Sequence, residues 1–134
     1  MKEGITFPEV QGVLLVIARM PVDGNFHWHT YIINTNDYHL SNLLMVSKGY
    51  STSQVPKLDT SILRYFIELL KSNSYAIIET LDPAVFELFN EFGISYYYDQ
   101  QTNNKSFVFT PGSIIDKHLV EIEALNLQGV LYIK

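Results

Sequence analysis

The chain has 134 residues, 47% of them hydrophobic and 17% charged, and nine basic against fourteen acidic residues give a net charge of −5. A chain of this length and composition can bury its own core, which excludes a disordered polypeptide. Nucleic acids and anionic lipid surfaces are bound mainly through clustered Lys and Arg. The only arginines are Arg19 and Arg64, and the lysines are scattered. We therefore expect no nucleic-acid partner and no membrane partner.

The absence of cysteine excludes disulfides, thiolate metal sites and cysteine nucleophiles. The first eight residues hold no apolar stretch suited to a signal peptide, and the longest apolar run, Val13 to Ala18, is far shorter than the ~20 residues of a membrane helix. We expect a cytoplasmic protein. No repeat or linker divides the chain, so residues 1–134 are predicted to form one domain.

The first predicted element is the short β-branched run from Gly12 to Ala18, which is typical of a strand covered on both faces. Pro21 is expected to end it, and Asp23-Gly24 to form a turn. A second strand is predicted over Asn25–Asn34. Alternation there puts one set of side chains on one face (Phe26, Trp28, Thr30, Ile32) and a second set on the other (His27, His29, Tyr31, Ile33).

After a polar turn at Thr35–Asp37, a strand is predicted at Leu43–Val46 and a polar loop at Ser51–Lys57. Residues 62–70 are ambiguous, because their apolar positions fit both a helical stripe and a strand face. We predict a strand, since aromatic and β-branched residues and the short polar segment 71–74 favour a hairpin with a strand over 75–79.

Asp82 and Pro83 predict a helix start, with one or two turns over Pro83–Phe89. A strand is predicted to follow from about Glu91. Its apolar face consists of Phe92, Ile94, Tyr96 and Tyr98. Asp99–Lys105 is predicted to be a polar hairpin loop, from which Ser106–Thr110 returns as a strand.

Ser113 and Asp116 resemble a capping box, which predicts a helical turn near Ile114–Leu119. A last strand is predicted at Val130–Ile133. About seven short strands separated by turns, with one or two short helical turns, predict an all-β fold: an immunoglobulin-like antiparallel β-sandwich.

Several phrases together resemble a family of small uncharacterised proteins from Bacteroidetes; they are Tyr31–Asn34, Val46–Tyr50, Ser74–Ala76, Phe107–Ile114 and Gly129–Leu131. Members are often labelled phenylalanyl-tRNA synthetase α subunit. A class II synthetase domain is much longer and holds ATP phosphates with arginine-bearing motifs, and no such motif surrounds Arg19 or Arg64. The resemblance thus implies a fold and a taxonomic group, and it assigns no functional residues.

The sharpest chemical pattern is His27-Trp28-His29, because residues two apart on a strand point the same way and could share one metal ion. A catalytic zinc site usually has three protein ligands, and His39 or Asp37 could supply the third. The alternative, which we prefer, makes both histidines polar residues on an outer strand face with Trp28 packed inward.

A second pattern is aromatic. Tyr97 is predicted to point away from the apolar face of Tyr96 and Tyr98, and it is with Tyr31 a candidate for contact with a partner. Stacking of exposed tyrosines on a sugar ring is a weaker alternative.

No Gly-x-Ser-x-Gly sequence and no phosphate-binding loop occur, and the acidic pairs suit a solvated face. The sequence favours a non-enzymatic, intracellular binding module that contacts another protein or itself and needs no cofactor. The alternative is a metal-binding protein or metal-dependent enzyme that uses His27 and His29.

Overall fold

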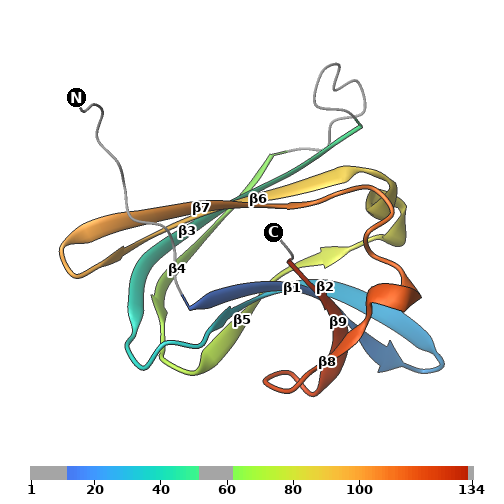
Figure 1. The fold of residues 1–134 in the computed structure, drawn as a ribbon, viewed down its shortest axis with the longest axis horizontal. Coiled ribbons are helices and arrows are strands. Elements are labelled where there is room, and N and C mark those ends of the chain that lie inside the picture. Colours follow the sequence, from blue (N-terminus) through green and yellow to red (C-terminus); the bar gives the residue numbers. More distant parts are fainter. Residues whose placement is uncertain (1–11, 52–61, 133–134) are drawn as a thin grey trace.

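The computed structural model describes residues 12–51 and 62–132, which form two antiparallel sheets packed face to face (Figure 1). The five-stranded sheet has the order β5 (Ser74–Leu81), β2 (Asn25–Asn34), β1 (Val13–Val22), β9 (Leu127–Leu131) and β8 (Val120–Ile122). The four-stranded sheet has the order β4 (Leu63–Leu70), β3 (Leu40–Tyr50), β6 (Phe89–Tyr98) and β7 (Gln101–Phe109). The predicted all-β sandwich is confirmed, and so is a strand over residues 62–70. The polar loop predicted at Ser51–Lys57 lies, apart from Ser51, outside the described residues.

The first hairpin follows from local chemistry. Asp23 and Gly24 both have positive φ, 50° and 83°, as the two central residues of a tight hairpin turn require. The prediction that β1 ends at Pro21 is wrong: β1 runs to Val22, and Pro21 pairs with Phe26 of β2. On its other side β1 pairs with β9 only over Val16–Arg19, so the missing N–H of Pro21 costs no ladder hydrogen bond.

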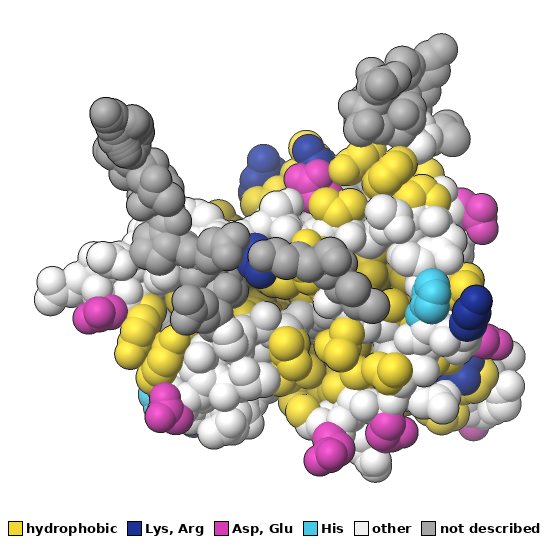
Figure 2. Space-filling view, viewed as in Figure 1, with side chains coloured by type: hydrophobic (Ala, Val, Ile, Leu, Met, Phe, Trp, Pro, Cys, Tyr) yellow, Lys and Arg dark blue, Asp and Glu magenta, His cyan; other side chains and the backbone are white. Residues whose placement is uncertain are grey.

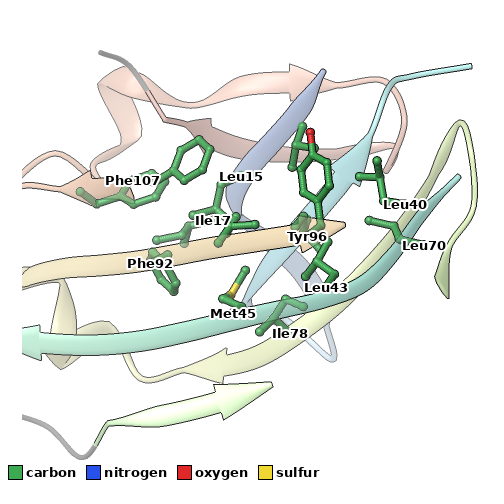
Figure 3. Close-up of a cluster of buried hydrophobic side chains, with 14 of the residues drawn as sticks. Leu15, Ile17, Leu40, Leu43, Met45, Leu70, Ile78, Phe92, Tyr96 and Phe107 are labelled. Atoms are coloured by element: carbon green, nitrogen blue, oxygen red, sulfur yellow. The ribbon is translucent and has the colours of Figure 1, made fainter. Parts of the chain in front are cut away.

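The main core lies between the two sheets, where apolar side chains from both inner faces interdigitate (Figure 3). Its most deeply buried members are Leu15, Ile17, Ile32, Leu40, Leu43, Met45, Phe92 and Ile94. A smaller cluster formed by Val16, Ala18, Tyr31, Ile33 and Ile122 lies on the opposite face of β1 and β2, with Leu125 and Leu127 of the β8–β9 hairpin packed against it. The middle of β1 is therefore buried on both faces, as its β-branched sequence predicted.

The connection from β4 to β5 corrects the predicted hairpin. β4 pairs with β3 and β5 pairs with β2, so the turn at residues 71–73 carries the chain from one sheet to the other. Asn34, fully buried on β2, fixes this crossing, because its Nδ2 donates to Leu70 O and Lys71 O, both at 3.1 Å. A turn sequence reveals a change of direction but not the sheet that the next strand joins.

The two helical turns differ in how they begin. Asp82 caps the 3-10 turn η1 (Pro83–Glu87) by accepting a hydrogen bond from Ala84 N at 2.9 Å, as predicted. The second, η2 (Asp116–His118), has Ile115 at its N-cap without a side-chain hydrogen bond. The predicted capping box at Ser113 is therefore wrong. The Ser113 hydroxyl donates to Thr110 O at 2.7 Å and closes the preceding turn instead.

The predicted loop over Asp99–Lys105 is mostly strand. The turn consists of Asp99 and Gln100, both with positive φ, and β7 begins at Gln101. Polar residues are tolerated there because β7 is an edge strand with a solvated outer face. In the part of the chain that the structure describes, no helix is long and apolar enough to cross a membrane.

Candidate functional site

The histidines of the predicted metal site are divided between two places. His27 and His29 lie on β2, and His29 packs edge-on against Tyr31, with ring centroids 6.1 Å apart. His39 Nδ1 accepts a hydrogen bond from Ser72 N at 2.9 Å and stabilises the β4–β5 turn. Within residues 12–51 and 62–132, no three His, Cys, Asp or Glu side chains gather closely enough to hold a metal ion. Metal binding by the His27–His29 pair alone stays a prediction, which metal analysis of a His27→Ala, His29→Ala double variant tests.

The two tyrosines predicted to contact a partner have opposite environments. Tyr97 is 46% exposed, and alternation with the buried Phe92, Ile94 and Tyr96 places it on the outer face of the four-stranded sheet. Tyr31 is only 1% exposed, and burial, followed by the repulsion of Tyr75, raises the pKa of its hydroxyl. Tyr97 therefore remains available for contact, whereas Tyr31 presents no surface.

A polar cluster joins the two sheets near β4 and β5. The Ser47 hydroxyl donates to Glu79 Oε1 at 2.8 Å, and the Tyr65 hydroxyl donates to Glu79 Oε2 at 3.2 Å. Burial, the negative charge of Glu79 and this hydrogen bond raise the pKa of Tyr65 to about 12. Ser47 thus faces a carboxylate instead of an imidazole base, and the geometry suits cohesion between sheets and not nucleophilic attack.

The most exposed apolar side chains of the four-stranded sheet lie on and beside β4. Phe66 is 64% exposed, more than any other large hydrophobic residue in the described ranges, and it pairs across the sheet with Leu44 of β3, which is 38% exposed. We define the β4 surface by its exposed apolar members on the outer face, Leu44 and Phe66; the exposed Leu63 and Leu69 lie at the alternate positions of β4. Hydrophobic side chains also emerge between acidic ones elsewhere, as the face in Figure 2 shows.

β4 is an edge strand, since in the described part of the chain it pairs with β3 alone. The opposite edge of the same sheet, β7, exposes polar residues instead, namely Gln101, Thr102, Asn104 and Ser106. Natural sheets commonly protect free edges with polar or charged residues, because an apolar edge invites pairing with another chain. β4 also exposes the charged Arg64 and Glu68, but between them it carries the exposed Phe66, which has no apolar counterpart among the exposed residues of β7.

The outer face of the sheet continues the β4 surface as a shallow depression of about 400 Å³. Leu44 and Val46 line it on one side and Ser95, Asn104 and Ser106 on the other. Gly93 forms part of its floor, and no atom lies within 4 Å of the place that a Cβ there would occupy. The outer face is therefore not closed over by its own side chains.

Sequence reasoning did not identify the β4 surface, although it used the residues concerned. Residues 62–70 are apolar at positions that fit both a helix and a strand, so their pattern alone decides neither the secondary structure nor the exposed face. An apolar segment that fills both faces of an edge strand leaves one set of side chains without cover. That was the available signal.

No family model, curated protein or solved structure matches the chain. The resemblance to the Bacteroidetes family stays a prediction.

Proposed function

We propose that this protein is a non-enzymatic β-sandwich binding module that acts by contact with protein at the β4 surface. The observation that carries the proposal is the 64% exposure of Phe66 near the middle of β4, which pairs with β3 on one side and has no strand partner among the described residues on the other. Burying a phenylalanine side chain contributes roughly 1.5–3 kcal/mol, and a free edge offers backbone hydrogen bonds to an added strand. Both gains are available to a protein partner.

The strand order supports an immunoglobulin-like type. In variable-type immunoglobulin sandwiches, strand C′ extends the sheet formed by G, F and C. The order β4-β3-β6-β7 has the same sequence of neighbours, with β4 in the place of C′. β8 and β9 would then be additions after the last strand of that pattern. We place the protein in the cytoplasm, on the absence of cysteine.

Photo-crosslinking in the producing cells tests the proposed contact. A photoreactive phenylalanine analogue replaces Phe66 in one variant and, as the control, Thr102 on the polar β7 edge in another. We expect a discrete crosslinked protein product from position 66 and none from position 102. Equal labelling at both positions, or no product from position 66, would refute contact at the β4 surface.

A further inference from the structure

We infer that the protein bound at β4 is a second copy of this chain, paired strand to strand about a twofold axis that passes between Phe66 and Phe66 of the partner subunit. This inference rests on the proposed function and deepens it by naming the partner. It depends on the order of charged and apolar residues along β4.

Residues two apart on a strand share a face, which aligns Arg64, Phe66 and Glu68 along β4. When two copies of β4 run antiparallel and are centred on Phe66, Arg64 lies opposite Glu68 of the partner subunit. The twofold axis repeats the pair, so the dimer gains two opposite-charge pairs on either side of two phenylalanines.

The charges select this arrangement over its alternatives. Parallel pairing in register would place Arg64 beside Arg64 of the partner subunit. In an antiparallel pairing centred on Tyr65 or Ile67, neither Arg64 would lie opposite a Glu68 of the other copy. Only the register centred on Phe66 matches every Arg64 with a Glu68.

Both side chains are available for such a pairing. Arg64 and Glu68 are exposed, and neither has an ion-pair or hydrogen-bond partner among the described residues. The edge of the other sheet lies on the same side, because β5 follows β4 after a turn of three residues.

Sedimentation velocity of the purified full chain, from roughly 1 to 200 µM, tests the inference by charge reversal. We compare wild type, Arg64→Glu, Glu68→Arg and an equimolar mixture of the two variants, with Lys117→Glu as a charge-matched control at an exposed position away from β4. Far-UV circular dichroism verifies that each variant is folded.

Wild type and Lys117→Glu are expected to dimerise alike, and each β4 variant to associate about tenfold more weakly, since like charges then face each other twice. The mixture is expected to recover the dimer, because the acidic strand of one variant complements the basic strand of the other. A wild type that stays monomeric, unchanged association of the variants, or a mixture that fails to recover would overturn the inference. If the protein is monomeric but position 66 still crosslinks to a different protein, the inference that the partner is a second copy is overturned and the proposed function stands.

Discussion

The Ser47 hydroxyl on β3 lies 2.8 Å from Glu79 Oε1 on β5, and this hydrogen bond ties one sheet of the sandwich to the other. The second carboxylate oxygen of Glu79 accepts from Tyr65 of β4 at 3.2 Å. One carboxylate thus joins the edges β4 and β5, which border the proposed contact.

Replacing Glu79 with Ala should lower the free energy of unfolding by about 2–3 kcal/mol, because two hydroxyls between the sheets lose a charged acceptor. Urea denaturation measures the change. The matched control is Glu87→Ala, whose side chain is exposed on η1, and its effect should stay within about 0.5 kcal/mol. Equal effects of the two substitutions would mean that the cluster does not hold the sheets together.

Stability should fall as the pH rises from about 10 to about 12. In the unfolded chain Tyr65 ionises near its ordinary pKa of 10.0, whereas in the folded protein its pKa is raised to about 12. Over that interval the folded state retains a proton that the unfolded state has lost, so the stabilising contribution, complete below pH 10, disappears. Denaturation at several pH values should show a smaller decline for Tyr65→Phe; an unchanged decline would contradict the assignment.

Gly129 and Gly93 should respond oppositely to alanine. A Cβ at Gly129 would lie 2.8 Å from Val16 Cγ1, 2.9 Å from Ala18 Cβ and 3.0 Å from Ile17 O, where β9 packs on β1. Gly129→Ala should therefore cost about 1–3 kcal/mol. Gly93→Ala meets open space and should be neutral or stabilise by up to about 1 kcal/mol. Thermal unfolding of both variants measures the two effects. Unchanged stability of Gly129→Ala would contradict the close packing of β9 on β1.

Asn34→Ala should destabilise the fold by at least about 2 kcal/mol, because Leu70 O and Lys71 O lose a buried donor at the crossing between sheets. Asn104→Ala, at an exposed site on β7, is the control for loss of an asparagine side chain. Hydrogen exchange should show faster opening at the start of β5 in the first variant only. If both variants unfold at the same urea concentration, Asn34 does not fix the crossing.

Local patterns predicted those elements whose signal is complete within a few residues. The bounds of β2 follow from the turn residues on either side of it, Asp23-Gly24 and Thr35–Asp37, and η1 follows from Asp82 and Pro83. Sheet membership did not follow, because Asn34 is near in space and distant in sequence from the β4–β5 turn that it holds. β8 has three residues, too few for a periodicity to be recognised.

For the candidate site too, local features were predictable and features that depend on distant parts of the chain were not. Exposure of Tyr97 followed from alternation, whereas burial of Tyr31 depended on the β8–β9 hairpin that covers the outer face of β2. The apolar character of residues 62–70 was plain in the sequence. That this character produces an exposed apolar surface follows only from the position of β4 at the edge of its sheet.

Amide hydrogen exchange along the two edges of the four-stranded sheet tests the central claim most directly. We predict that raising the concentration of purified protein, or adding the protein crosslinked through position 66, slows exchange at Leu63–Leu70 of β4 and leaves exchange at Gln101–Phe109 of β7 unchanged. Protection that appears on β7 or on the β8–β9 hairpin, with β4 unchanged, would contradict it.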